Sequence, residues 1–183
     1  MFLFATLAET GIVVARACPS VPISEKILSV ALFAGHDGRN IELTAIRVVA
    51  CLLGLLGSSI CLWCYQELGK YFTFELSVQQ DHKLIKTGPY SIVRHPSYTS
   101  FVWNSMAVIT IHGAQGSWVR ESGLLNSFVG KILALSALIF LTTTSMGLLR
   151  RVGEEDELMK KQFGSQWDEW AVEVPYVLLP GII

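Results

Sequence analysis

The sequence is poor in charged residues and shows no internal repeat or low-complexity tract. Only 16% of its 183 residues are Asp, Glu, Lys or Arg, whereas 51% are hydrophobic. Soluble domains carry about 25% charged residues. The formal net charge of −1 excludes a general basic field for nucleic acid. This composition favours a polytopic membrane protein over a soluble domain.

The four cysteines, Cys18, Cys51, Cys61 and Cys64, give no sign of a disulfide framework. The C-x-x-C spacing of Cys61 and Cys64 lacks the partner ligands of a zinc site and the βαβ context of a redox site. We therefore expect buried thiols in an apolar helix and no metal site. The first residues also lack the basic region of a signal peptide, so we expect no cleavage there, which leaves open whether sequence precedes Met1.

Four apolar stretches approach the about 20 residues that a bilayer-spanning helix needs. They cover residues 1–17, 43–65, 97–112 and 124–149. A shorter apolar run, residues 27–34, suggests a re-entrant or interfacial piece or part of a kinked pass. It lies within residues 18–40, a connection rich in turn residues.

These runs predict an all-α, polytopic transmembrane helical bundle of about four to five membrane segments. We expect one integral-membrane domain over residues 1–183, with N-terminal spans in residues 1–65 and a functional half in residues 66–183. Residues 66–96 and the tail from residue 150 each contain four Lys or Arg. The positive-inside rule predicts that both segments face the cytosol.

A polar segment with two prolines, residues 88–98, lies between two of the apolar runs. Charged, irregular backbone beside a bilayer is tolerated where it lines a cavity or faces water, so this segment predicts a site. Pro96 suits the first position of a helix, which places His95 at the mouth of the third run. Two alternatives stay open: His95 as an interfacial cap, and Tyr90 and Tyr98 as aromatic-belt anchors.

The tail predicts a separate helix that starts in the acidic residues 154–157 and stops at Gly164. Spacing of four residues predicts the pairs Asp156–Lys160 and Glu157–Lys161, with a solvated acidic face as the alternative.

Arg151 and Glu155 are also four residues apart and therefore share a helix face. They lie where the fourth apolar run leaves the bilayer. A charged pair at that depth is costly unless it faces a polar cavity.

Two motifs of this sequence, which are separated by two apolar runs, resemble the isoprenylcysteine carboxyl methyltransferase family of endoplasmic reticulum membrane enzymes. The resemblance covers roughly residues 65–180. R-H-P-x-Y alone also occurs in other membrane methyltransferases and in related reductases, but the pair of motifs is far more specific. The motifs are Gly88-x-Tyr90-x-x-x-Arg94-His95-Pro96-Ser97-Tyr98 and Arg151-x-x-Glu154-Glu155-x-x-Leu158, the latter followed by Phe163-Gly164-x-x-Trp167-x-x-Trp170 and by Pro180.

The resemblance implies S-adenosylmethionine as cofactor and the C-terminal prenylcysteine of processed CaaX proteins as the methyl acceptor, either farnesylated or geranylgeranylated. It implies a multi-pass protein of the endoplasmic reticulum membrane, with a cytosolic pocket built from the loop before the third span and the tail helix. Arg151 would bind the substrate carboxylate and form the catalytic pair with Glu155. The cofactor-binding residues that it implies are Gln79 (or Gln80), His82, Lys83, Leu84, Ile85, Tyr90, His95, Pro96, Ser97, Tyr98 and Glu155.

The sequence departs from the family pattern at three places. Ser100 follows Thr99 where the family often has glycine, and Trp167 and Trp170 occupy aromatic positions that are tyrosines in the family. These changes leave the implied cofactor contacts in place.

Methyl transfer to a carboxylate suits these residues on physical grounds. A carboxylate is ionised at neutral pH, so the reaction needs positioning and removal of water rather than a general base. An arginine can hold a carboxylate with two hydrogen bonds, and a prenyl chain would enter from the lipid. We expect prenylcysteine and membrane lipid as partners, and no nucleic acid. The alternatives are a phospholipid N-methyltransferase, a membrane sterol or quinone reductase that binds NADPH, and a non-catalytic membrane scaffold.

Overall fold

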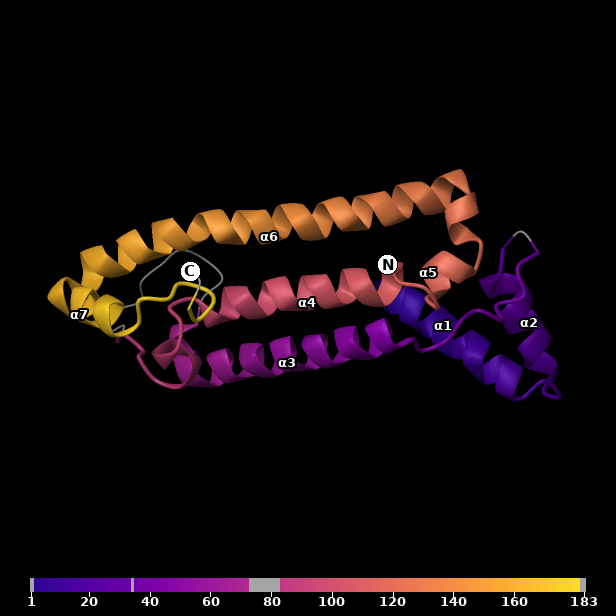
Figure 1. Cartoon of the computed structure of the whole chain (residues 1–183), viewed down its shortest axis with the longest axis horizontal. Coiled ribbons are helices and arrows are strands. Elements are labelled where there is room, and N and C mark those ends of the chain that lie inside the picture. Colours follow the sequence, from indigo (N-terminus) through magenta and orange to yellow (C-terminus); the bar gives the residue numbers. More distant parts are fainter. Residues whose placement is uncertain (1, 34, 73–82, 182–183) are drawn as a thin grey trace. The chain divides into compact units, whose positions relative to one another are not determined.

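The helices of this protein follow the apolar runs of its sequence, and in the described residues all regular secondary structure is helical (Figure 1). The computed structural model describes residues 2–33, 35–72 and 83–181. In chain order the elements are α1 (Phe2–Ala17), α2 (Pro22–Ala31), α3 (Ala45–Leu68), η1 (Gly69–Tyr71), η2 (Gly88–Ser91), α4 (Pro96–Gly113), α5 (Trp118–Glu121), η3 (Leu124–Asn126), α6 (Phe128–Phe163) and α7 (Ser165–Glu173).

Two helices in the described part of the chain are long and apolar enough to cross a membrane. They are Ala45–Tyr71, which is α3 continued by η1, and Phe128–Phe163, which is α6. Only 17% and 6% of their most apolar segments are buried. The core helix of a soluble protein would be buried, so this exposure favours contact with lipid. The expected total of four to five membrane segments stays a prediction.

Several helix boundaries agree with the sequence, and two do not. The α4 helix begins at Pro96, and α6 ends just before Gly164, whose φ is +53°, so both boundary predictions are confirmed. The predicted separate tail helix is wrong, because α6 runs without a break from the fourth apolar run through the acidic residues. The connection after α1 contains the helix α2, which overlaps the apolar run 27–34 but begins at Pro22, before that run starts.

One compact unit comprises Met1–Leu53 with Ser105–Thr142. Its core gathers around Trp118, whose indole N–H donates to the carbonyl of Ala31 at 2.7 Å. Glu9, the acid that interrupts the first apolar run, pairs with Arg47 and accepts the backbone N–H of Trp118 at 2.9 Å. Arg47 is only 4% exposed, and its other donors bind the carbonyls of Ile111, Glu42 and Gly116.

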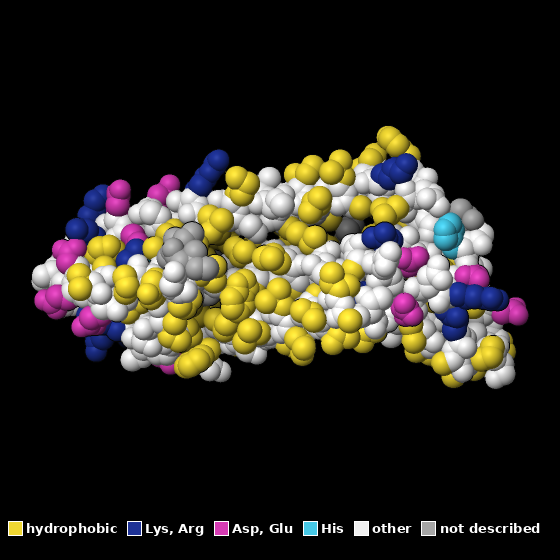
Figure 2. All heavy atoms as spheres, in the orientation of Figure 1, with side chains coloured by type: hydrophobic (Ala, Val, Ile, Leu, Met, Phe, Trp, Pro, Cys, Tyr) yellow, Lys and Arg dark blue, Asp and Glu magenta, His cyan; other side chains and the backbone are white. Residues whose placement is uncertain are grey.

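The second compact unit comprises Gly54–Asn104 with Thr143–Ile183. Its core contains Cys64, Tyr90, Trp170 and Val174. Figure 1 shows the chain after α7 folding back beside the start of α4. Charged side chains gather around α7 and the end of α6 (Figure 2), whereas the neighbouring surface is largely hydrophobic. All the residues of the candidate site that the structure describes belong to this unit.

Candidate active site

The segment before α4 is held by a glutamate at the end of α3. Glu67 accepts the Thr87 hydroxyl at 2.6 Å and the Trp63 indole N–H at 3.0 Å. Gly88 follows with φ of +59°, and a Cβ added there would lie 2.7 Å from the Glu67 carboxylate oxygen. A glycine is therefore required both by the left-handed backbone and by the close approach of Glu67.

Tyr90 is the buried anchor of this segment. It belongs to the same core cluster as Cys64 and Trp170. Burial, together with the neighbouring thiol, raises the pKa of Tyr90 well above its usual range. Tyr90 therefore stays a neutral phenol, suited to positioning rather than to acid–base chemistry.

The end of the chain completes the segment by backbone pairing. The Arg94 N–H donates to the carbonyl of Tyr176 and the His95 N–H to that of Val177, each at 2.9 Å. The Thr99 hydroxyl donates to the carbonyl of Leu178 at 2.7 Å. These bonds hold His95 in place at the start of α4.

His95 lies between two carboxylates of α6. Its Nε2 is 2.8 Å from Asp156 Oδ1, and its Nδ1 is 3.4 Å from Glu155 Oε2. Burial lowers the pKa of His95, but the bonds to Asp156 and Glu155 outweigh burial, so the net shift is upward. The charged imidazolium is therefore favoured here.

Glu155 brings the start of α4 together with Arg151. The Tyr98 hydroxyl donates to Glu155 Oε1 at 2.5 Å, and Arg151 Nε donates to the same oxygen at 3.1 Å. The rings of His95 and Tyr98 are stacked with an interplanar angle of 7°. Two segments more than 50 residues apart thus share one hydrogen-bonded cluster.

This cluster forms one side of a cavity of about 420 Å³. That volume lies in the range of about 300–1,000 Å³ that is usual for small-molecule sites. The charged residues of its lining are Arg94, His95, Arg151, Glu155 and Asp156. The remaining lining is mainly apolar and aromatic and includes Tyr65, Phe72, Leu84, Ile85, Phe101 and Leu148.

The structure brings most of the predicted site residues to this cavity. Its lining includes Leu84, Ile85, Tyr90, His95, Ser97, Tyr98, Arg151 and Glu155. Pro96 is buried as the first residue of α4, and Lys83 is exposed. Gln79 and His82, as well as the alternative Gln80, lie outside the described residues.

One predicted ion pair is wrong. Asp156 binds His95 and Arg94 instead of Lys160, and Lys160 binds Asp168 at 2.8 Å. The Glu157–Lys161 pair is confirmed, at 3.9 Å. Asp156 faces the start of α4, so it cannot also lie on the solvent face with Lys160.

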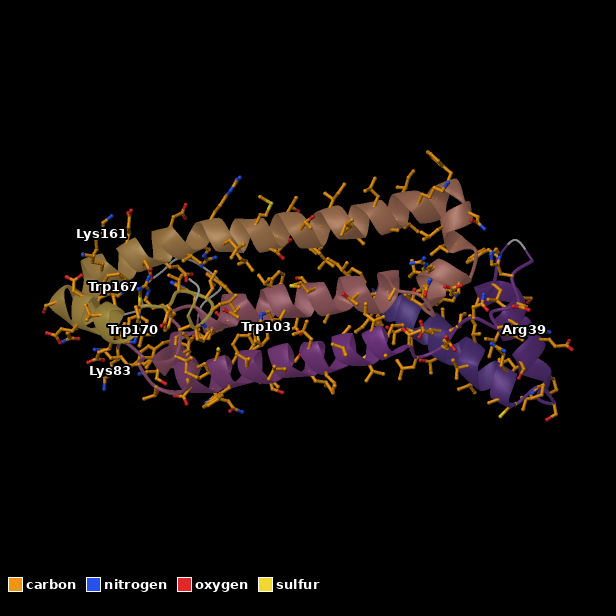
Figure 3. The ribbon with its side chains drawn as sticks, viewed as in Figure 1. Arg39, Lys83, Trp103, Lys161, Trp167 and Trp170 are labelled. Atoms are coloured by element: carbon orange, nitrogen blue, oxygen red, sulfur yellow. The ribbon has the colours of Figure 1, made fainter. Side chains whose placement is uncertain are left out.

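The lining residues that sequence reasoning missed include three with hydrogen-bonding side chains that stand within the two motifs. They are Arg94, Asp156 and Trp170. Arg94 stands inside the first motif and Asp156 directly follows Glu155. Their position next to predicted site residues could have indicated that they belong to the site. Trp170 comes from α7 (Figure 3), and its aromatic position in the second motif was the signal there. Among the described residues no group of three His, Cys, Asp or Glu is arranged to hold a metal ion.

Comparison with known proteins gives matches to one family. Residues 48–119, which include the whole segment before α4, match the model of the Isoprenylcysteine carboxyl methyltransferase (ICMT) family. The chain is 30% identical over 110 residues to protein-S-isoprenylcysteine O-methyltransferase B of Arabidopsis thaliana, an alignment that covers 58% of this chain and 46% of the relative.

The chain is also 40% identical over 58 residues to protein-S-isoprenylcysteine O-methyltransferase of Saccharomyces cerevisiae. This alignment covers 31% of this chain and 24% of the relative. The chain thus spans less than half the length of the curated relatives that it matches. The resemblance that the two motifs indicate is confirmed by these matches, and residues 48–119 are similar to the isoprenylcysteine carboxyl methyltransferase family.

Proposed function

We propose that this protein transfers a methyl group from S-adenosylmethionine to the C-terminal carboxylate of a prenylated cysteine, as found in processed CaaX proteins. The observation that carries the proposal is the meeting of Tyr98 with Glu155 and Arg151 at a cavity whose lining combines these charged groups with many apolar and aromatic side chains. A prenylcysteine has the same division, with one carboxylate and a long apolar chain.

The residues present fit the cofactor. S-adenosylmethionine supplies a methyl group on a sulfonium, and because its acceptor here is an ionised carboxylate, no proton has to be moved. The cofactor has a charged amino-acid end and a heteroaromatic end. The cavity offers carboxylates and His95 on one side, and a buried indole N–H without a partner in the described residues, that of Trp170, on another.

Arg151 is the residue assigned to the acceptor carboxylate. A guanidinium carries five N–H donors in a planar fork, so its bond to Glu155 is compatible with binding a second carboxylate. Glu155 in turn orients Arg151 and accepts donors from the cofactor. Its neighbours Tyr98 and His95 hold that carboxylate in one orientation.

The apolar walls contribute by excluding water. An anion that loses its hydration shell reacts more readily when the surrounding groups are already oriented. Phe101 and Leu148 belong to α4 and α6, so an apolar chain beside them lies between helices. We propose that the prenyl group enters there from the lipid. We place the protein in the endoplasmic reticulum membrane with this cavity facing the cytosol.

The test is methyl transfer by the purified full chain reconstituted in lipid vesicles. Labelled S-adenosylmethionine is supplied with N-acetyl-farnesylcysteine, with its methyl ester, or with phosphatidylethanolamine vesicles. We expect label to enter N-acetyl-farnesylcysteine alone, as a base-labile ester. The methyl ester is the matched control because it differs only in the blocked carboxylate.

Other outcomes separate the alternatives. Label in phosphatidylethanolamine would replace the proposal with phospholipid N-methylation. Binding of NADPH without binding of S-adenosylhomocysteine would favour a reductase. Absence of both cofactor binding and transfer would leave a non-catalytic membrane protein.

A further inference from the structure

Trp170 presents a buried hydrogen-bond donor at the cavity. Its side chain is only 4% exposed, and it lines the cavity from α7 (Figure 3). Its indole Nε1 has no hydrogen-bond partner among the described residues. Buried polar groups in native proteins are nearly always paired, so an unpaired donor beside a cavity indicates an acceptor on a ligand.

The surroundings of Trp170 indicate what kind of ligand group that is. Trp170 belongs to a core cluster with Cys64, Tyr90 and Val174. Leu84 and Ile85 pack against this cluster, and they line the cavity together with Tyr90. These are apolar or aromatic, and Tyr90 is a neutral phenol. The charged residues of the lining are Arg94, His95, Arg151, Glu155 and Asp156, and ion pairs join them to one another.

We propose that Trp170 binds the adenine ring of the cofactor and donates its indole N–H to one of the ring nitrogens. Adenine is flat and apolar on its faces and carries unprotonated ring nitrogens that accept hydrogen bonds. The amino-acid end of the cofactor is charged and suits the cluster around Glu155. This inference rests on the proposed function and adds to it the orientation of the cofactor and a residue that selects the base.

The chain offers a matched control in Trp167, one helical turn before Trp170. Its Nε1 is likewise buried without a partner in the described residues. Trp167, however, is absent from the cavity lining and is flanked by two cations, with Arg94 5.8 Å and Lys160 5.6 Å from its ring. Removal of its indole N–H therefore leaves the cavity donor in place.

The experiment measures dissociation constants by titration calorimetry on the full-length protein in detergent. The probes are S-adenosylhomocysteine and its 1-deaza, 3-deaza and 7-deaza analogues, each of which lacks one ring nitrogen of the adenine. The proteins are the wild type, Trp170→Phe and Trp167→Phe. Comparing analogues on one protein removes any effect of the substitution on folding.

The wild type and Trp167→Phe are expected to bind one deaza analogue about fivefold to tenfold more weakly than the parent compound, as for loss of one hydrogen bond. Trp170→Phe is expected to bind the parent more weakly by the same factor and to lose the discrimination. Equal binding of all four compounds by the wild type, or discrimination retained in Trp170→Phe, would overturn this inference while leaving the methyltransferase proposal intact. A wild type that binds none of the compounds would overturn both.

Discussion

Asp156 Oδ1 lies 2.8 Å from His95 Nε2, and the other oxygen of the same carboxylate lies 3.2 Å from an Arg94 guanidinium nitrogen. One side chain of α6 thereby binds two consecutive residues at the start of α4. The side chains of all three are largely buried. Because Glu155 on the same helix binds Tyr98 and also contacts His95, two adjacent acids join the two elements and share His95 as a partner.

The first prediction is a pH-dependent contribution of His95 to stability. Its pKa is raised, so the folded protein binds the imidazolium proton more tightly than the unfolded chain does. The contribution is fully present below the unfolded pKa of about 6.5 and is lost as pH rises through the higher folded value.

The measurement is thermal unfolding of wild type and His95→Asn without ligand, from pH 5.5 to 8.5, in about half-unit steps. We expect the unfolding temperature of the wild type to exceed that of the variant most at the acidic end of this range. The difference between the two temperatures should shrink as pH rises. A difference that stays constant or grows with pH would show that the two carboxylates do not hold a protonated His95.

The second prediction concerns coupling between Tyr98 and Glu155. Their bond is 2.5 Å long and joins a phenol to a carboxylate, so its loss should cost about 1.5–3 kcal/mol. We expect Tyr98→Phe and Glu155→Gln each to weaken binding of S-adenosylhomocysteine, and the double variant to be less impaired than the sum of the two effects. Interaction energies of about 0.5–3 kcal/mol are typical of residues in contact. Strict additivity would mean that the two side chains act independently.

The third prediction tests the glycine before Tyr90. Gly88→Ala places a Cβ 2.7 Å from a Glu67 carboxylate oxygen in a backbone with φ of +59°. We expect a loss of about 1–2 kcal/mol in the free energy of unfolding, the usual cost of a left-handed conformation. Gly153→Ala is the control, because nothing lies within 4 Å of its added Cβ and alanine favours a helix. Equal unfolding temperatures for the two variants would contradict the proposed constraint.

The fourth prediction concerns the Glu9–Arg47 pair of the other unit. Arg47→Met leaves Glu9 without its cationic partner, and breaking a buried pair costs about 3–5 kcal/mol. The double variant Arg47→Met with Glu9→Gln should regain part of the lost stability, because no unpaired charge then remains. Arg39→Met is the control, since Arg39 pairs with Asp37 on the surface, where the side chains are 79% and 62% exposed. If the Arg47→Met variant proved as stable to unfolding as the Arg39→Met variant, the Glu9–Arg47 pair would be dispensable.

Sequence patterns predicted the local features of this fold well, because those features depend on neighbouring residues. Pro96 opens α4 and Gly164 follows α6, as the rules for helix ends require. The i,i+4 relation of Arg151 and Glu155 also follows from helix geometry alone. The prediction of a helix start in the acidic residues 154–157 was wrong, because acidic residues within a long helix give the same sequence pattern as acidic residues at a helix start.

The rest of the site depends on contacts between distant segments, which periodicity cannot reveal. Asp156 had a suitable partner four residues away in Lys160, yet it binds His95, 61 residues distant. The return of residues 176 and 177 to pair with Arg94 and His95 leaves no mark in the sequence, because backbone groups make those bonds. The positive-inside rule predicted that Arg151 and Glu155 lie on the same side of the membrane as the first motif, and the family resemblance supplied their roles in one site.

The measurement that tests the central claim most directly is the rate of methyl transfer to N-acetyl-farnesylcysteine by reconstituted wild type, Arg151→Lys and Arg151→Ala, each with its dissociation constant for S-adenosylhomocysteine. If Arg151 holds the acceptor carboxylate beside Glu155, the alanine variant loses transfer while still binding the cofactor product, and lysine restores only a small part because it lacks the planar fork. Full transfer by Arg151→Ala would contradict the account.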